Sequence, residues 1–348
     1  MDFAPTQEEL FARARADLRM GLPVLIAGQL VFAVETISSE RFGALMAGAA
    51  RPVLAITDWR AATLKARAYD GDVARIIVPQ DARLPWACAV ADPADDLSAP
   101  MKGPFETLRE GTADAHRAGI ALAKAAHLLP AVLVAPAAET TGLTEVPVTP
   151  LATSPLGDVV SAGLPMALAG RGRLHVFRPE DGGEEHYAVE IGAPDRSAPV
   201  LARLHSACFT GDVLGSLKCD CGPQLNGALE QMGREGAGVL LYLNQEGRGI
   251  GLANKMRAYA LQDQGFDTVE ANHRLGFEDD ERNFALGAEL LGKLGFKSVR
   301  LMTNNPAKVA RMEEQGVEVA ERVPLRVGEN ALNAEYLATK AKKSGHLL

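Results

Sequence analysis

Apolar residues in the first part of the chain form short runs that are typical of buried strands, and helical stretches separate these runs. Residues 24–27, 52–56 and 131–135 predict strands of this kind, whereas the alanine-rich residues 118–126 predict a helix. The alternation of the two patterns indicates an α/β domain over residues 1–135, in which helices cover the strands.

The pattern changes over residues 136–171, which we predict to be a linker. Proline, threonine and serine cluster there, as in residues 146–150 (Val-Pro-Val-Thr-Pro) and 153–157 (Thr-Ser-Pro-Leu-Gly). Such residues interrupt helices and strands rather than extend them. A chain of 348 residues is long enough for two domains, so we expect a second domain over residues 172–348.

The second domain shows a sharper alternation of strand and helix patterns. Residues 174–177 and 186–191 predict a hairpin around Gly182 and Gly183. The later elements are strands at 238–243, 298–302 and 317–323, and helices at 252–264, 279–294 and 306–315. The whole chain is thus expected to be α+β or α/β, with a C-terminal mixed sheet, flanking helices and ligand-binding loops at one end of the strands.

Composition and charge exclude several classes of protein. Hydrophobic residues make up 47% of the chain and charged residues 23%, which is ordinary for globular domains. The net charge of −8 argues against a nucleic-acid partner. Apolar runs stay shorter than a membrane span, and the first residues lack a signal-peptide pattern. We therefore expect a cytoplasmic protein with no membrane or nucleic-acid partner.

Three of the four cysteines, Cys208, Cys219 and Cys221, lie within fourteen residues of one another. If residues 219–221 are extended, the side chains of Cys219 and Cys221 point to the same side, so both can bind one ion together with Cys208. Three protein ligands leave one tetrahedral position of zinc for water, as in catalytic sites. The alternatives are a disulfide or plain buried thiols. Cys88 lies in an apolar segment and is expected to be an inert buried thiol.

A glycine-rich turn at residues 246–251 joins a predicted strand to the helix that carries Lys255, Tyr259 and Gln262 on one face. The turn can bring backbone N–H groups and Arg248 to a phosphate, or it can be a simple tight connection. Tyr259 can act as a proton donor, or it can pack at the helix edge.

Two further polar segments each have two interpretations, one in which they bind a ligand and one in which they only cap a helix. Residues 278–283 can supply Asp280 as a base and Arg282 as a phosphate-binding group, or they can cap a helix with acidic side chains. Residues 303–308 can form a polar or phosphate subsite, or Asn305 can simply cap the helix that starts at Pro306. Arg203 and His205, just before the first cysteine, can face a ligand, and His205 can instead support the metal site.

The order of these motifs resembles GTP cyclohydrolase II, the family of enzymes that opens riboflavin biosynthesis. The resemblance covers about residue 172 to the C-terminus. It is carried by residues 203–212, 219–224, 243–252, 255–263, 267–272, 280–284 and 303–308. The family's zinc ligands match Cys208, Cys219 and Cys221, and its catalytic residues match Tyr259, Asp280 and Arg282. Its GTP-binding positions match Arg203, Leu204, His205, Ser206, Ala207, Gln224, Glu246, Gly247, Arg248, Thr268, Thr303 and Lys308.

The resemblance implies hydrolysis of GTP to 2,5-diamino-6-ribosylamino-4(3H)-pyrimidinone 5′-phosphate, formate and pyrophosphate by a homodimer. One Zn²⁺ per subunit lowers the pKa of a water and so supplies the nucleophile that opens the guanine imidazole ring at C8. Tyr259 assists proton transfer, Gln224 recognises the base, and Mg²⁺ accompanies the phosphates. Arg282 attacks the α-phosphate with Asp280 as proton acceptor, or it stabilises charge there. The chain departs from the family at Ala207, where glutamate is usual.

The N-terminal domain resembles a degenerate 3,4-dihydroxy-2-butanone 4-phosphate synthase. That synthase carries an acidic loop that holds Mg²⁺, but here an apolar strand runs through residues 27–35 in its place. His116 matches a later histidine of the synthase, and a histidine without carboxylates does not bind these metals. We expect no synthase activity and a scaffold or dimerisation role.

Two other functions remain open on these residues. The first is a related enzyme that stops at a formamide product or serves another pathway, for which Ala207 is the one indication in the motifs. The second is a non-catalytic protein that binds zinc and nucleotide, which would not need Tyr259, Asp280 and Arg282.

Overall fold

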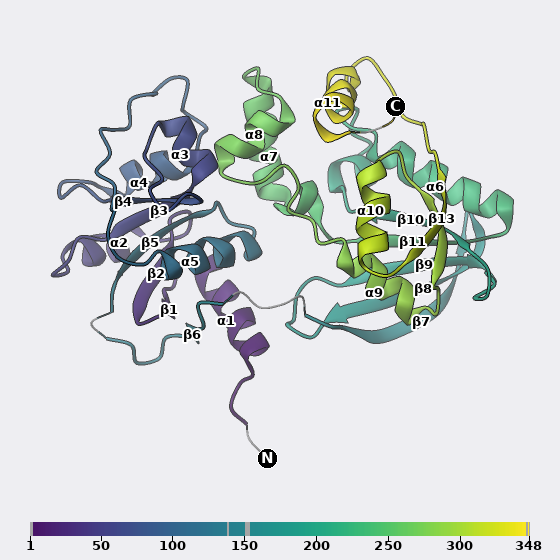
Figure 1. Ribbon diagram of the computed structural model, residues 1–348, viewed down its shortest axis with the longest axis horizontal. Helices are drawn as coiled ribbons and strands as arrows, with labels where there is room; N and C mark the ends of the chain where they lie inside the picture. The colour runs from purple at the N-terminus through teal and green to yellow at the C-terminus, as the bar shows by residue number, and fades with distance from the viewer. Residues whose placement is uncertain (1–2, 138, 150–153, 346, 348) are drawn as a thin grey trace. The chain divides into compact units, whose positions relative to one another are not determined.

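The structure is a computed structural model that describes residues 3–137, 139–149, 154–345 and 347. It divides into two compact units, each built on its own mixed sheet (Figure 1). The N-terminal unit comprises Met1–Ser154 and Ile250–Glu281, and the C-terminal unit comprises Pro155–Gly249 and Arg282–Leu348. These units differ from the contiguous domains expected from the sequence, because a segment of the second half belongs to the first unit.

The N-terminal unit contains a six-stranded sheet in the order β4-β3-β5-β2-β1-β6. Its neighbouring strands are antiparallel, except for the parallel pair of β1 and β6. The strands are β1 (Val24–Ile26), β2 (Gln29–Ala33), β3 (Val53–Thr57), β4 (Val73–Ile77), β5 (Ala131–Pro136) and β6 (Glu145–Val146). The three strands expected from the apolar runs are therefore confirmed.

The strand expected through residues 27–35 is wrong at its start. Ala27 and Gly28 have positive φ values of 50° and 72° and form a two-residue turn between β1 and β2. Two consecutive residues of positive φ match the right-handed twist of antiparallel strands. The apolar run conceals this turn, because Ala27 carries no turn signal of its own.

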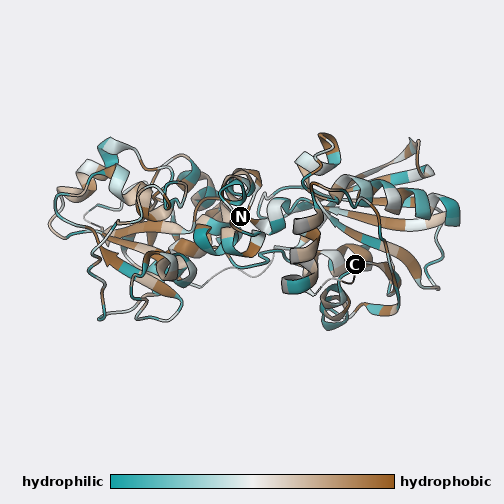
Figure 2. Cartoon of the chain, turned by 90° about the horizontal axis from the view of Figure 1, so that it is seen from above, coloured by the Kyte–Doolittle hydropathy of each residue, from teal (hydrophilic) through white to brown (hydrophobic). Residues whose placement is uncertain are grey.

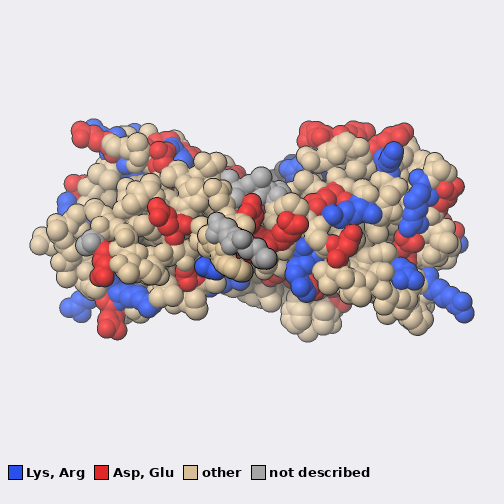
Figure 3. Space-filling view, turned by 90° about the horizontal axis from the view of Figure 1, so that it is seen from below, with Lys and Arg blue, Asp and Glu red and all other residues tan. Residues whose placement is uncertain are grey.

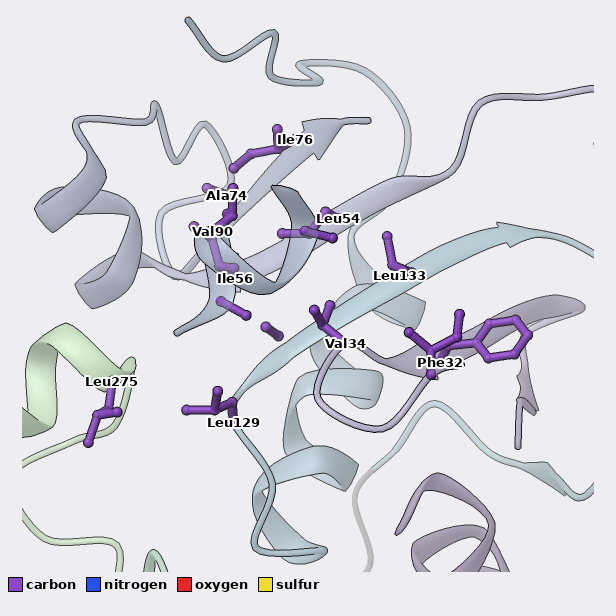
Figure 4. Packing of buried hydrophobic residues seen from close by; sticks show 14 of the residues in the cluster. Phe32, Val34, Leu54, Ile56, Ala74, Ile76, Val90, Leu129, Leu133 and Leu275 are labelled. Carbon is purple, nitrogen blue, oxygen red and sulfur yellow. The ribbon is translucent and has the colours of Figure 1, made fainter. Parts of the chain in front are cut away.

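Helices from both parts of the chain complete the N-terminal unit. They are α1 (Gln7–Arg19), α2 (Ser39–Met46), α3 (Asp58–Leu64), α4 (Leu84–Ala91), α5 (Asp114–Ala125), α7 (Leu252–Asp263) and α8 (Thr268–Leu275). Leu261 of α7 and Leu275 of α8 are buried in the same apolar cluster as Leu54 and Ile56 of β3 (Figure 4). Burial of these side chains, at about 1.5–3 kcal/mol for each leucine, explains why α7 and α8 belong to this unit.

One buried histidine makes the N-terminal unit sensitive to acid. His116 of α5 is 5% exposed, and neither ring nitrogen has a hydrogen-bond partner among the described residues. Burial, with a smaller contribution from the nearby Arg75 charge, lowers the pKa of His116 from 6.5 to about 4. The unfolded chain therefore takes up a proton at a higher pH than the folded chain does.

We expect the free energy of unfolding to fall as the pH drops from 6.5 towards 4. Between about pH 7 and about pH 5 the loss from His116 amounts to at most about 2 kcal/mol. Urea unfolding of the wild type and of His116→Leu at both pH values measures this loss. The His116→Leu variant should show a shallower pH dependence, and equal slopes would show that His116 does not carry the effect.

The C-terminal unit contains a seven-stranded sheet in the order β13-β12-β10-β11-β9-β8-β7. The four strands from β13 to β11 are parallel, and the remaining pairs are antiparallel. The strands are β7 (Leu156–Met166), β8 (Gly170–Pro179), β9 (His186–Gly192), β10 (Val200–Ser206), β11 (Ala237–Leu243), β12 (Ser298–Met302) and β13 (Glu318–Val323). The expected hairpin, the three later strands and a mixed sheet are thus confirmed.

The C-terminal unit's helices are α6 (Cys221–Glu235), α9 (Ala285–Lys293), α10 (Pro306–Glu314) and α11 (Ala334–Ser344). The helix expected over residues 279–294 starts only at Ala285, and residues 278–283 form the loop before it. The capping role expected for the acidic residues of this loop is therefore wrong, since the N-cap of α9 is Phe284, which makes no side-chain cap, and the first turn of α9 contains no acidic residue.

Part of the expected linker is also structured. Residues 156–166 form β7, which pairs with β8 along its whole length. Most side chains of β7 are exposed, so no alternation of apolar and polar residues marks this strand in the sequence. Backbone pairing with β8, rather than burial of one face, defines it. Residues 150–153 of the expected linker lie outside the described residues.

Figures 2 and 3 show how hydropathy and charge are distributed over the chain. Hydrophobic residues, drawn in brown, are frequent in the strands, whereas the helices combine hydrophobic and hydrophilic residues (Figure 2). On the face seen in Figure 3, acidic and basic side chains are interspersed. In the described part of the chain, no helix combines the length and apolarity that a bilayer crossing requires.

Candidate active site

Three thiols meet at the carboxyl end of β10, in the parallel part of the C-terminal sheet. Cys208 follows β10 and precedes one π-helical turn, Phe209–Val213, and Cys221 is the first residue of α6. The Sγ atoms of Cys208, Cys219 and Cys221 lie within 4.8 Å of one another. None of the three cysteines forms a disulfide.

The expected extended conformation of residues 219–221 is wrong, because the helix α6 starts at Cys221. Cys219 lies in the loop before this helix, and its Sγ is 3.7 Å from the Sγ of Cys208. The three thiols meet because β10, the π-turn and the start of α6 converge, which local spacing alone does not determine.

The cluster fits a soft metal ion such as zinc. The neighbouring Cys208 thiol raises the pKa of Cys219, and it raises the pKa of Cys221 well above the ordinary value. Three thiolates at this spacing repel one another, so a cation is needed to hold all three in the ionised state. Sulfur ligands suit Zn²⁺, and three of them form the protein's share of an open tetrahedral site.

Gly211 lies directly against the three cysteines. A Cβ atom at this position would be 2.9 Å from the Sγ of Cys219 and 3.1 Å from the Sγ of Cys208. It would also lie 2.9 Å from the Cβ of Cys221. Only glycine leaves the space that the sulfur atoms occupy, and the local sequence pattern gives no sign of this role.

We expect Gly211→Ala to weaken metal binding by about tenfold or more, because the added methyl group displaces the thiols from their common centre. Competition with a chromophoric chelator measures the affinity. Gly292→Ala is the matched control, since a Cβ at Gly292 of α9 meets no atom within 4 Å. Wild-type affinity in the Gly211→Ala protein would contradict this account of the cluster.

A buried carboxylate behind the thiols was also not anticipated from the sequence. Asp212 is 2% exposed at its side chain, and its oxygens bond the Nε2 of His205 at 2.9 Å. The same carboxylate accepts from the backbone N–H of Cys208 at 3.0 Å and from the hydroxyl of Tyr242 at 2.9 Å. Asp212 thus ties the first cysteine to β10 and β11. His205 contacts Asp212 and so supports the cysteine loop, one of its two expected roles.

A second buried network orients Gln224, the glutamine expected to recognise the base. Its Nε2 donates to Asp220 at 2.8 Å, and its Oε1 accepts from the guanidinium of Arg203. Arg203 also donates to the carbonyl of Met302 at 2.9 Å, while its Nε has no partner among the described residues. Burial lowers the pKa of Arg203 to about 10, so the side chain stays charged at neutral pH. The amide of Gln224 is therefore held in one orientation.

Three cations surround the ring of Phe284, beside the end of β10. The guanidinium of Arg282 lies 5.1 Å from the ring centroid and that of Arg311 4.6 Å, and the Nζ of Lys308 lies 5.7 Å away. Arg282 donates to the Oγ of Ser206 at 3.3 Å, and Lys308 donates to the carbonyl of Leu204 at 3.3 Å. This concentration of positive charge suits a phosphate chain.

The polar segment before α10 keeps both of its expected roles open. Asn305 caps the helix by accepting from the N–H of Ala307 at 2.9 Å, so the local capping role is confirmed. Thr303 is buried, and its hydroxyl accepts from the N–H of Asn305 at 3.0 Å. A phosphate-binding role for Thr303 stays a prediction.

The glycine-rich turn is held to the cysteine loop by a carboxylate. Glu246 accepts from the backbone N–H of Phe209 at 2.6 Å and from that of Gly247 at 3.0 Å. Gly247 and Arg248 both have left-handed backbone angles, with φ of 64° and 63°. Positive φ is costly at a residue such as Arg248, and residues of this kind cluster at ligand sites. Ala207 donates its N–H to the carbonyl of Leu243 at 2.8 Å, so its backbone is part of the same framework.

The remaining expected site residues belong to the N-terminal unit. Tyr259 is half-buried on α7, with the Nζ of Lys255 lying 5.7 Å from its ring centroid. Thr268, the first residue of α8, accepts at its hydroxyl from the Nε2 of Gln262 at 3.0 Å. Asp280 lies in the loop after α8. Within the C-terminal unit, the structure groups the cysteines with His205 and Glu246, Arg203 with Gln224, and Arg282 with Ser206, Leu204 and Lys308.

Comparisons with known proteins agree on one family. The family model of GTP cyclohydrolase II matches residues 158–324. GTP cyclohydrolase-2 from Azospirillum brasilense is 45% identical over 96% of this chain and 93% of its own length. The protein of the same name from Actinobacillus succinogenes is 59% identical over 49% of this chain and 79% of its own length.

Solved structures were also found to be similar, and one of them matches most of this chain. It is RibBX, a two-domain 3,4-dihydroxy-2-butanone 4-phosphate synthase from A. baumannii, with a TM-score of 0.29 and 15% sequence identity. The match covers 90% of this chain and 99% of the RibBX chain. On the sequence relatives and the family model, with the thiol cluster and the ordered motifs described above, this chain belongs to the GTP cyclohydrolase II family.

Proposed function

We infer that this chain is a GTP cyclohydrolase II that hydrolyses GTP in the riboflavin pathway. Relatives of that name at 45% and 59% identity support this activity. The products are 2,5-diamino-6-ribosylamino-4(3H)-pyrimidinone 5′-phosphate, formate and pyrophosphate. The observation that carries the mechanism is the cluster of three thiols around Gly211, because a site with three protein ligands is the arrangement of a catalytic metal rather than a structural one.

Zinc held by Cys208, Cys219 and Cys221 would supply a water of lowered pKa for the hydrolytic opening of the guanine ring. Asp212 keeps the Cys208 loop in place through the backbone N–H of Cys208. Gln224 keeps one amide N–H and one carbonyl lone pair beyond its bonds to Asp220 and Arg203, and these groups suit the edge of a guanine base. Tyr259 donates or accepts a proton as the ring opens.

Two of the cations around Phe284, Arg282 and Lys308, bind the triphosphate. Arg282 and Lys308 neutralise charge on the phosphate chain, and Asp280 accepts a proton as pyrophosphate leaves. A guanidinium remains protonated at neutral pH, so electrostatic stabilisation is the simpler role of Arg282, with covalent attack as the alternative. Mg²⁺ with the departing phosphates, a homodimer and a cytoplasmic location remain predictions from the family resemblance.

Product analysis tests this function directly. Purified protein loaded with zinc and given GTP and Mg²⁺ should release formate and pyrophosphate in equal amounts, with the diaminopyrimidinone as the third product in mass spectrometry. Ala207 supports one second candidate, an enzyme that retains the formyl group. A product that keeps the formyl mass would favour that candidate, and unchanged GTP would contradict both.

The N-terminal half is proposed to lack synthase activity of its own. Incubation with ribulose 5-phosphate should yield no butanone phosphate. Formation of that product by the purified protein would overturn this part of the proposal and would leave the GTP reaction unaffected.

A further inference from the structure

The segment Ile250–Glu281 carries two residues with proposed catalytic roles, Tyr259 and Asp280, yet it is packed into the N-terminal unit. Residues from the first half of the chain contact this segment near both of its ends. The first half of the chain itself contributes none of the groups proposed to touch the substrate.

The first contact holds α7 two residues away from Tyr259. The guanidinium of Arg257 donates to the Oε1 of Glu35 at 3.0 Å and lies 3.4 Å from a carboxylate oxygen of Asp92. The other oxygen of Glu35 accepts from the backbone N–H of Leu129 at 2.8 Å, so Glu35 joins α7 to the chain just before β5. Side chains two positions apart on a helix point in different directions. The contact at Arg257 therefore determines where the face that carries Tyr259 points.

A buried amide strengthens this contact one turn earlier. Asn254 is fully buried and donates to the backbone carbonyl of His127 at 3.0 Å. The Oδ1 of Asn254 accepts from the guanidinium of Arg257 at 2.7 Å. The side chains of Asn254 and Arg257 are therefore bonded to each other and, on the same side of α7, to residues of the first half of the chain. A Cβ at Gly251 would lie 2.8 Å from the Cβ of His127, which shows how closely the start of α7 approaches the first half of the chain.

The second contact lies next to Asp280. The Nζ of Lys124, on α5, is 2.6 Å from the Oε1 of Glu281, and both side chains are mostly buried. The same oxygen accepts from the backbone N–H of Glu278 at 2.9 Å, which closes the loop of residues 278–281 around Asp280. Thr57 adds a hydrogen bond from its hydroxyl to the carbonyl of Gly276 at 2.9 Å. The loop is thus tied to α5 and to β3.

We propose that Glu35 and Lys124 are positioning residues for GTP hydrolysis: Glu35 orients Tyr259 through Arg257, and Lys124 orients Asp280 through Glu281. The proposal rests on the roles assigned above to Tyr259 and Asp280. Under this proposal, the first half of the chain positions the segment Ile250–Glu281 and catalyses no reaction of its own. Misplacement of a reacting group by about 1 Å can cost about a hundredfold in rate, so weak contacts of this kind have measurable consequences.

The test compares Glu35→Gln and Lys124→Gln in the full-length, zinc-loaded protein. Formate and pyrophosphate release are measured separately with GTP and Mg²⁺. Glu35→Gln should slow formate release about tenfold or more and raise the ratio of pyrophosphate to formate above one, since Tyr259 serves ring opening. Lys124→Gln should slow pyrophosphate release by a similar factor, about tenfold, without raising that ratio. The KM for GTP should change much less than kcat in both variants.

Controls separate positioning from loss of structure. Arg51→Gln removes the exposed ion pair with Glu106 in the same unit and touches no residue of 250–281, so it should keep wild-type rates. Zinc content and melting temperature should stay at wild-type values in all variants. The conservative variant Lys124→Arg should keep pyrophosphate release near the wild-type rate, because it retains a cation for Glu281 and leaves the bond of Glu281 to Glu278 in place.

Other outcomes overturn the proposal. Wild-type rates in Glu35→Gln and Lys124→Gln would show that the contacts do not position the segment. Equal slowing of both products in step with a lowered melting temperature would reduce the contacts to a structural role. A wild-type protein that makes neither product would instead refute the proposed function itself, so the two failures are distinguishable.

Discussion

Cys219→Ser should abolish formate release from GTP while the protein remains folded. Serine removes one of three sulfur ligands whose Sγ atoms lie within 4.8 Å of one another, and a hydroxyl is a poor replacement for a thiolate on zinc. Loss of the metal removes its activated water, so we expect the rate to fall on the order of a thousandfold, equivalent to several kcal/mol of barrier. Formate assays and elemental analysis for zinc provide the two measurements.

Cys88→Ser is the control for the loss of any thiol. Cys88 lies on α4 of the N-terminal unit, outside the cluster, and burial raises the pKa of its thiol. This variant should retain zinc and full formate release. Pyrophosphate release in Cys219→Ser should persist in part, because the residues proposed to act on the phosphates, Arg282 and Lys308, are unchanged. Full formate release from zinc-free Cys219→Ser protein would remove the metal from the mechanism.

Arg282→Gln should reduce pyrophosphate release by about a hundredfold to a thousandfold. The substitution removes the guanidinium that donates to Ser206 and lies 5.1 Å from the ring centroid of Phe284, while glutamine keeps a polar side chain of moderate length. A group that stabilises charge only as the leaving pyrophosphate departs lowers kcat and kcat/KM together when it is removed. Steady-state kinetics of pyrophosphate release measures both constants.

Arg311→Gln provides the matched control, since Arg311 also lies over Phe284, at 4.6 Å, but matches no functional position of the family. It should change pyrophosphate release only slightly, because Arg311 is not among the residues assigned to the phosphates. Arg282→Lys then separates charge from shape: a large loss would show that the guanidinium fork is required. Similar losses in Arg282→Gln and Arg311→Gln would mean that the total positive charge matters rather than Arg282 itself.

In the C-terminal unit, local sequence patterns predict some secondary-structure elements correctly and miss others. The hairpin of β8 and β9, the strands β11 to β13 and the helix α10 follow from periodicity and from punctuation by glycine and proline. The segment 156–166 and the loop at 278–283 do not, because an exposed strand has no alternation and an acidic loop has the composition of a helix start. In both segments the secondary structure depends on residues elsewhere in the chain, so the local sequence alone does not predict it.

The sequence by itself determined the chemistry of the candidate site. Three cysteines within fourteen residues and the fixed order of the motifs after them predicted the family and the proposed ligand set, since residue type and spacing are local properties. Only the tertiary structure decided that Asp212 and Gly211 shape the thiol cluster and that residues 250–281 join the N-terminal unit. Those features depend on contacts between residues far apart in the chain, where the burial of apolar side chains such as Leu261 and Leu275, rather than any local pattern, determines the outcome.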